Sequence, residues 1–398
     1  MGISYYNKLM TIDWRKEILP LVALSALCFV LLGFQLGKTG LIDPDEPFYS
    51  LTAKEMLARH DPSTPFMFGR PQFEKPILFY WVIYAFFRWL GVSEFSARLG
   101  PCLAGTVVVF VTYFWARVLF RRRHSAFLSA AVLAVSAQFV ILSRIVLTDI
   151  FLCLFVTAAF FCFSLGERFT RDRVLFRNLV FVFSALGFLT KGPLGFLIPF
   201  SGILSYLYLT DGRRSVAGMP WLSGLTLFVL IGFPWYALMT QKYGVAFLKQ
   251  TFLHENLRRF FVAEHTGSDK AAFYPWVLFF GFFPWSGFLV PALAHAARKS
   301  AQKRNLFLGL SFLLPFLFFC AAKSKLMSYI FPVYPAVALL TGAWMFRLYR
   351  AVRLGFKPKP ALIGMNALVW AVLPSLLVAG TFLYAQKTVS RPIVRFYS

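Results

Sequence analysis

Apolar runs of about 20 residues recur along this chain of 398 residues, and they constrain its fold more than any other feature. A run of that length is what an α-helix needs to cross the hydrocarbon core of a bilayer. The runs are continuous rather than alternating, so they do not indicate membrane β-strands. Only 14% of the residues are charged, whereas a soluble domain has about a quarter, which disfavours a large soluble helical core. The sequence therefore predicts an all-α polytopic membrane protein.

We expect about eleven transmembrane helices in a single membrane domain that covers residues 1–398. The predicted spans are 18–37, 96–119, 125–143, 148–165, 174–190, 193–210, 220–238, 275–296, 305–322, 326–346 and 361–384. The first span follows Lys8, Arg15 and Lys16 without a small-residue cleavage site behind it, so it is expected to be a retained signal anchor. No C-terminal soluble domain is expected, because little sequence follows the last span.

The basic residues predict the orientation of the spans. Clusters such as Arg121-Arg122-Arg123 and the stretch from Arg298 to Arg304 fall in alternate gaps, and the positive-inside rule makes that side cytoplasmic. The N-terminus is then inside, and residues 38–95 and 239–274 form a first and a long outer loop. Most of the net charge of +25 lies in short loops between spans, so it does not indicate nucleic-acid binding.

Two segments of the first outer loop, 46–60 and 77–90, are expected to be juxtamembrane helices. The second has 14 residues, which is short for a span, and its aromatic side chains suit the membrane interface. If it crossed the membrane, every later basic cluster would move to the outside. Pro47 fits the first turn of the other helix, and Asp45 and Glu46 lie at its positive N-terminal end.

Acidic residues and histidines gather in the predicted outer loops. Asp43, Asp45 and Glu46 are three of only 16 acidic residues, and carboxylates at a membrane face are costly unless they pair, bind metal or do chemistry. A phosphate-bearing substrate needs cations, and removing a proton from a hydroxyl needs a base. Structural roles remain open alternatives, such as an ion pair between Arg144 and Asp149, interfacial snorkelling of the lysines or helix capping by the histidines.

These outer segments resemble those of the polyprenyl-phosphate-dependent glycosyltransferases of the C-type membrane fold. The resemblance is to the branch of the lipid A aminoarabinose transferase and, more distantly, to the protein O-mannosyltransferases. The matching segments lie in family order and include Asp45-Glu46-Pro-Phe-Tyr49, Phe73-Glu74-Lys75-Pro76, Ser96-Ala-Arg98-Leu99, Arg144 to Asp149, Leu189-Thr-Lys191-Gly-Pro193, His254-Glu-Asn256-Leu-Arg258-Arg-Phe260 and Lys323-Ser-Lys325 through Tyr329.

The resemblance implies a role for each candidate residue. Asp45 is implied to be the acidic residue at the reaction centre, with Asp149 as a second catalytic residue. The implied ligands of the donor phosphate are Lys75, Arg258, Arg259 and Tyr329. The residues expected to line the active site are Glu46, Glu74, Lys191, His254, Lys323 and Lys325. A divalent metal ion is implied near Glu74 and a loop histidine, here His254, and no nucleotide cofactor is expected because there is no P-loop or Rossmann glycine pattern.

We therefore expect an inverting enzyme at the outer, periplasmic face of a bacterial inner membrane. It would transfer a sugar from undecaprenyl phosphate to lipid A, lipopolysaccharide or another envelope acceptor. A protein hydroxyl is the alternative acceptor. A lipid-linked sugar flippase or transporter is the alternative class, but it predicts charges at the bilayer midplane and repeated halves. The expected partners are the lipid-linked donor, a lipid or glycan acceptor and membrane lipids, without nucleic acid.

Two departures from the family pattern bear on specificity. The aminoarabinose branch has an arginine three residues after the first motif aspartate, where this chain has Phe48. The missing phosphate ligand would then come from Arg258, Arg259 or Arg70. The further spans and C-terminal outer domain of the family do not follow the eleventh expected span, so acceptor recognition is expected to be simpler or assisted by an accessory protein.

Overall fold

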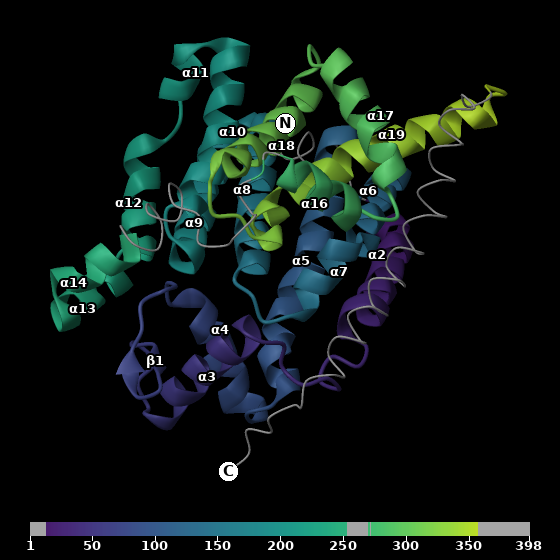
Figure 1. Ribbon diagram of the computed structural model, residues 1–398. Helices are drawn as coiled ribbons and strands as arrows, with labels where there is room; N and C mark the ends of the chain where they lie inside the picture. Colours follow the sequence, from purple (N-terminus) through teal and green to yellow (C-terminus); the bar gives the residue numbers. More distant parts are fainter. Residues whose placement is uncertain (1–12, 253–269, 271, 357–398) are drawn as a thin grey trace.

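The computed structural model describes residues 13–252, 270 and 272–356, and every statement about structure below concerns that part of the chain. It is helical apart from one short hairpin (Figure 1). The elements of its first half are α2 (Trp14–Cys28), η1 (Phe29–Gly33), α3 (Asp45–Ala58), β1 (Phe66–Met67), β2 (Arg70–Pro71), α4 (Leu78–Leu90), α5 (Glu94–Phe120), α6 (Arg123–Val135), α7 (Ala137–Arg144), α8 (Asp149–Arg168) and η2 (Thr170–Asp172). Those of its second half are α9 (Arg173–Lys191), α10 (Leu194–Asp211), α11 (Arg213–Ala217), α12 (Trp221–Gly232), α13 (Pro234–Tyr243), α14 (Val245–Leu248), α16 (Phe273–Gly281), α17 (Ser286–Arg298), α18 (Lys303–Ala321), η4 (Met327–Val333) and α19 (Tyr334–Arg353).

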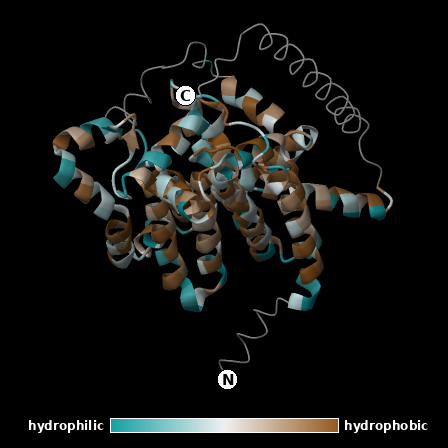
Figure 2. Ribbon diagram, turned by 90° about the horizontal axis from the view of Figure 1, so that it is seen from below, coloured by the Kyte–Doolittle hydropathy of each residue, from teal (hydrophilic) through white to brown (hydrophobic). Residues whose placement is uncertain are grey.

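The long helices match the predicted spans one by one. Seven helices of the described part are long and apolar enough to cross a membrane, and there are up to ten if each of three bent pairs is one span. These ten fall on the first ten predicted spans, whereas 361–384 lies outside the described residues, so the count of eleven stays a prediction. Hydrophobic residues follow the bodies of these helices, and hydrophilic residues concentrate at their ends and in the loops (Figure 2).

Three of the predicted spans are not straight. The pairs α6–α7 and α12–α13 bend by 63° and 45°, and the pair α16–α17 bends by 115° at Phe282 to Trp285. The sequence analysis predicted one span over 275–296, and the structure divides this segment into two helices. This segment is a broken span or a re-entrant hairpin, since Pro284 interrupts the helical hydrogen bonds there.

Helix α8 lies at the centre of the bundle, where it packs against α5, α9, α10 and η4. Its neighbours α9 and α10 form a tight hairpin, because Gly192 turns the chain with φ of 64°. A Cβ atom added at Gly195 would lie 2.1 Å from the carbonyl carbon of Gly187, so only glycine allows this approach. The close contact fixes the end of α9, where Lys191 lies.

The two helices expected in the first outer loop are both present. Helices α3 and α4 lie together at one end of the bundle, with the hairpin β1–β2 between them in the sequence (Figure 1). Helix α4 is amphipathic, since Tyr80, Ile83 and Phe87 are buried while Trp89 is exposed. The antiparallel strands pair Phe66 with Pro71 and Met67 with Arg70.

The predicted loop 239–274 is partly helical. Its first residues complete α13 and form α14, and Phe273 begins α16. The aromatic rings of Tyr243 and Phe247 each lie 5.0 Å from the ring of Phe73, so this segment packs on the first outer loop. The two outer segments that the sequence predicted separately are thus in contact.

Candidate active site

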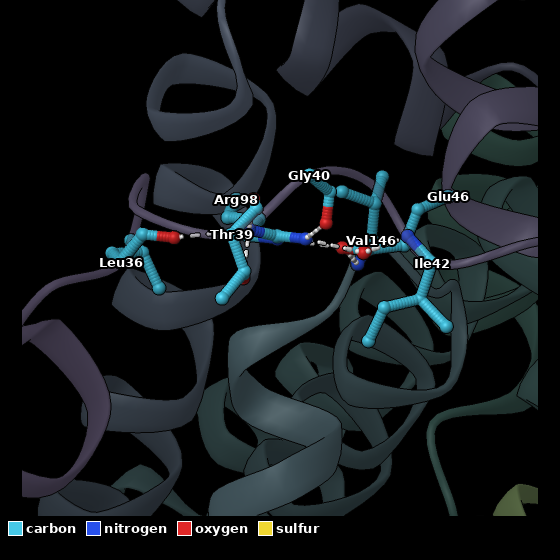
Figure 3. A network of polar contacts seen from close by, with 7 residues as sticks. All are labelled: Leu36, Thr39, Gly40, Ile42, Glu46, Arg98 and Val146. Carbon is cyan, nitrogen blue, oxygen red and sulfur yellow. Dashed lines mark hydrogen bonds and ion pairs between the residues drawn. The ribbon is translucent and has the colours of Figure 1, made fainter. Parts of the chain in front are cut away.

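A buried ion pair holds the beginning of α3 against the bundle (Figure 3). Arg98 on α5 donates from Nη2 to Glu46 Oε2 at 2.6 Å and from Nε to Oε1 at 2.8 Å. Both residues are 2% exposed. The same guanidinium donates to three carbonyl oxygens of the loop that precedes α3, those of Leu36, Thr39 and Gly40.

Both carboxylate oxygens of Glu46 also accept a hydrogen bond from a backbone amide. Its Oε2 accepts the amide of Ile42 at 2.8 Å, and its Oε1 accepts the amide of Val146 at 2.9 Å. A buried ion pair is tolerated when its remaining hydrogen-bonding capacity is satisfied in this way. Glu46, which the sequence analysis expected to line the active site, therefore acts in this structure as a positioning residue for the loop and for α3.

Asp45 differs sharply from its neighbour. It is the first residue of α3, and its side chain is exposed, whereas Glu46 is buried. Consecutive helical residues point about 100° apart, so one of the two carboxylates can be fixed in the bundle while the other faces outward. Phe48, which replaces the arginine of the resembling branch, is partly buried and has its ring 5.1 Å from that of Tyr49.

A second ion pair joins two long helices at the same end of the bundle. Lys191, the last residue of α9, donates to Asp149, the first residue of α8, with 2.6 Å between Nζ and Oδ1. The Lys191 ammonium also lies 4.3 Å from the centre of the Tyr329 ring, which is a cation–π contact. Three predicted site residues from different segments are thus in direct contact. Lys191 does not snorkel outward, because its side chain is only 10% exposed.

Arg144 has a different role from the ion pair considered for it. Its Nη1 donates to the carbonyls of Leu31 and Leu32, and its Nη2 donates to that of Phe34, at 2.9 to 3.1 Å. Leu31 and Leu32 lie in the last turn of η1, where carbonyl groups need partners outside the helix, and Phe34 follows it. Arg144 therefore caps the first span, and the partner of Asp149 is Lys191.

Tyr49 is a buried tyrosine of α3. It is 4% exposed and its ring packs against Phe79 and Tyr80 of α4. Burial raises the pKa of the Tyr49 hydroxyl well above its usual value, and so do the neighbouring Tyr80 and the charges of Asp45, Asp149 and Glu74. These three carboxylates come from separate segments of the chain, and the charge of each acts on this hydroxyl.

Glu74 and Lys75 lie in the turn before α4, and both are partly exposed. The side chain of Gln72 shapes this turn, since its Oε1 accepts the Glu74 amide at 3.1 Å and its Nε2 donates to Tyr80 Oη at 2.7 Å. Phe73 is buried, and its ring packs against Tyr243 of α13 and Phe247 of α14, which holds the turn in place. The side chains of Glu74 and Lys75 are therefore presented from a fixed backbone.

The remaining candidates divide into two groups. Lys323 is exposed and Lys325 is 3% exposed, and both lie in the turn between α18 and η4, next to the segment that carries Tyr329. His254, Arg258 and Arg259 lie outside the described residues.

The metal site implied at Glu74 and His254 is not tested by this structure. The described part of the chain holds no group of three or more His, Cys, Asp or Glu side chains that could bind a metal ion. Because His254 lies outside that part, the metal ion stays a prediction, and no chemical step below depends on it.

Several residues of the site had no role in the sequence analysis. Arg98 and Tyr49 were parts of matching segments, Gln72 preceded one of them, and Tyr80 lay in the predicted helix 77–90. The signal that could have identified Arg98 is a cation near the start of an apolar span, which must find an acidic partner to be buried.

The arrangement provides an exposed carboxylate, a cation on a rigid turn and a buried ion pair behind them. Asp45 can accept a proton from a hydroxyl, and Lys75 can contact an anion. Asp149, Lys191 and Tyr329 hold the helix ends that border this region. A reaction between a hydroxyl and a phosphate-bearing substrate suits these groups.

Comparison with known proteins agrees with this geometry. The family described as dolichyl-phosphate-mannose-protein mannosyltransferase matches residues 21–248. An undecaprenyl phosphate-alpha-4-amino-4-deoxy-L-arabinose arabinosyl transferase of Pectobacterium carotovorum is 31% identical over 341 residues, which cover 84% of this chain and 60% of that protein.

Solved structures show the same fold. The crystal structure of ArnT from Cupriavidus metallidurans bound to undecaprenyl phosphate superposes with a TM-score of 0.78 at 23% identity, covering 97% of this chain and 67% of that one. The archaeal oligosaccharyltransferase AglB of Archaeoglobus fulgidus superposes with a TM-score of 0.58 at 13% identity, covering 93% of this chain and 56% of that one. The chain thus spans about 60% of the length of the arabinosyl transferase that it resembles.

Proposed function

Because this chain belongs to the dolichyl-phosphate-mannose-protein mannosyltransferase family of polyprenyl-phosphate-dependent glycosyltransferases, we propose that it transfers a sugar from a polyprenyl phosphate to a hydroxyl acceptor. The donor class is a sugar on undecaprenyl phosphate, the lipid named for both relatives above. The acceptor is lipid A or another envelope glycan. The reaction takes place at the end of the bundle that carries α3 and α4, which is the outer face of the inner membrane.

One observation carries this proposal above the others. Asp149, Lys191 and Tyr329 come from three separate segments and are in direct contact, and the Val146 amide, three residues before Asp149, donates to Glu46, the neighbour of Asp45. Charged groups that are brought together from separate segments at the end of a helix bundle are typical of a functional site.

The proposed step is a single displacement at the anomeric carbon. The acceptor oxygen attacks that carbon while its proton passes to Asp45, and the bond from carbon to the phosphate oxygen breaks. The polyprenyl phosphate leaves with the electron pair, and Lys75 stabilises the charge that develops on it. Attack opposite the leaving group inverts the anomeric configuration. Asp149 and Lys191 keep the ends of α8 and α9 in place beneath the reacting groups.

The positions of the charged residues favour an enzyme over a transporter. Asp149 begins α8 and Lys191 ends α9, so these charges lie at helix ends rather than near the middle of the bilayer. A transporter would be expected to carry ionisable residues at the midplane.

The test compares two neighbouring aspartates in membranes that contain a labelled undecaprenyl-phosphate sugar and an acceptor. Asp45→Asn is expected to lower the transfer rate at least about a hundredfold, because general base catalysis typically contributes that much or more. Asp43→Asn is the matched control, since Asp43 is also exposed and lies two residues away. Undiminished transfer by Asp45→Asn would refute the base assignment.

The acceptor is tested separately. Mass spectrometry of lipid A, envelope glycans and envelope proteins from a strain that lacks the gene should show which of them loses a sugar. If only the envelope proteins lose a sugar, the acceptor is a protein hydroxyl and not lipid A or a glycan.

A further inference from the structure

We propose that a basic cavity at the opposite end of the bundle binds a phosphate group, supplied by the headgroup of an anionic phospholipid or by free phosphate. The cavity has a volume of about 510 Å³ and lies where the ends of α5, α8, α9, α10 and α18 meet. It is separate from the candidate active site, because α8 begins at Asp149 in that site and ends at Arg168 in the cavity. A helix of 20 residues places these two ends about 30 Å apart.

The charge of the cavity is strongly positive. Six of its lining residues are basic, namely Arg121, Arg168, Arg173, Arg177, Lys303 and Arg304, and two are acidic, Glu167 and Asp211. Each acidic residue already has a partner. Arg177 Nη2 lies 2.9 Å from Glu167 Oε1, and Lys303 Nζ lies 3.4 Å from Asp211 Oδ1. The other four arginines have no carboxylate partner in the described part of the chain.

Two of the arginines also present buried donors without an acceptor. The Nε–H groups of Arg177 and Arg304 are buried and have no hydrogen-bond partner among the described residues. The whole Arg177 residue is only 4% exposed, and its Nη1 donates to the carbonyl of Gly218 at 2.8 Å. A buried N–H group without an acceptor is unfavourable, so an acceptor that enters this cavity would be bound through it.

A phosphate group meets the requirements of these donors. It offers several strong acceptor oxygens and negative charge, and the planar guanidinium group binds phosphate through paired hydrogen bonds. The negative charge of the phosphate also relieves the repulsion among closely spaced arginines. A neutral polar ligand would satisfy the free N–H groups but would leave the excess positive charge uncompensated.

The cavity also has an apolar side, which suits a lipid. Leu119, Phe163 and Phe307 line it together with the arginines. Basic pockets between transmembrane helices at a membrane surface are recognised sites for anionic lipid headgroups. The ends of these helices lie in the gaps that the charge pattern assigns to the cytoplasmic side, where anionic lipids reside.

The experiment uses the purified full chain in detergent and the double variant Arg168→Gln/Arg304→Gln. Native mass spectrometry follows the binding of added phosphatidylglycerol, with phosphatidylcholine as the zwitterionic comparison. The double variant should bind phosphatidylglycerol at least about tenfold more weakly, since charge-assisted contacts to phosphate are lost. Arg298→Gln is the matched control, because Arg298 is an exposed arginine at the end of α17 and does not line the cavity.

A second measurement separates the two sources of phosphate. Inorganic phosphate is titrated at constant ionic strength while the midpoint of thermal unfolding is followed. A higher midpoint in the unsubstituted chain but not in the double variant identifies free phosphate as a ligand. Binding of phosphatidylglycerol without that effect identifies the lipid headgroup.

Two results would overturn the proposal. One is equal lipid binding and equal response to phosphate in the double variant and the unsubstituted chain. The other is an equal loss in Arg298→Gln, which would show that only total charge matters. If the double variant does not fold, the single variant Arg173→Gln replaces it, because Arg173 also lines the cavity, is only partly buried, and makes one long contact, 3.3 Å from its Nε to the Gly166 carbonyl.

Discussion

Replacing Arg98 by methionine would leave the carboxylate of Glu46 buried without a counter-charge. In the native structure this carboxylate is 2% exposed and receives two hydrogen bonds from the guanidinium and two from backbone amides. The Arg98→Met variant keeps an unbranched apolar stem but removes the guanidinium and with it all of the donors. Three carbonyl groups of the loop before α3 lose a partner at the same time.

The size of the effect follows from that burial. Removing one member of a buried ion pair costs about 3 to 5 kcal/mol. Because α5 and α8 pack independently of the loop, we expect the loss to appear as local detachment of residues 34–46 rather than as unfolding of the bundle. At about 1.4 kcal/mol for each factor of ten, the equilibrium constant for detachment of this segment should rise by roughly two to three and a half orders of magnitude.

Hydrogen exchange of the purified chain in detergent measures this opening directly. The amides of Ile42 and Glu46 should exchange faster by about that factor in Arg98→Met, and sugar transfer should fall with them because Asp45 lies in the same segment. The double variant Glu46→Gln/Arg98→Met should recover part of the protection, since no charge is then left unpaired.

Arg88→Met is the control, because Arg88 is exposed on α4. If exchange in Arg98→Met stays within about threefold of that in Arg88→Met, the ion pair does not hold the loop and the reasoning is wrong.

Two further outcomes follow from the packing. Gly195→Ala should separate α9 from α10 at a cost of about 1 to 3 kcal/mol and should lower both the unfolding midpoint and sugar transfer, since Lys191 moves. Gly309→Ala, which meets no atom within 4 Å, should preserve both, and equal loss in the two variants would contradict the argument. Tyr49 has a raised pKa, so its neutral form stabilises the fold below about pH 10, and that stabilisation is lost as the pH rises through the raised pKa. The unfolding midpoint of the native chain should therefore fall more steeply above about pH 10 than that of Tyr49→Phe, and parallel curves would show that the hydroxyl does not matter.

The helices were predictable because their signal is local. The length of each apolar run is set by the bilayer, and the short, aromatic-rich apolar run 77–90 identified α4 within one residue at its start. The bends were not predicted, since Pro234 and Pro284 break a helix only in the context of the helices around them.

The candidate site was predictable as a set of residues but not as a set of contacts. Sequence proximity suggested Arg144 as the partner of Asp149, whereas Lys191, 42 residues away, holds that position. Arg98 and Glu46 are 52 residues apart, and only the packing of α3 on the bundle brings them together. Tertiary contacts of this kind leave no periodic pattern in the sequence.

The contrast between Asp45 and Glu46 has a consequence for how this stretch can change in evolution. One residue separates an exposed carboxylate from one locked by Arg98, and one residue in a helix corresponds to about 100° of rotation. Inserting one residue between Asp45 and Glu46 would turn the two side chains about a further 100° apart, so they could not both keep their present positions. The spacing of Asp45 and Glu46 is therefore constrained together with their identity, whereas related chains should tolerate substitution of the exposed Asp43.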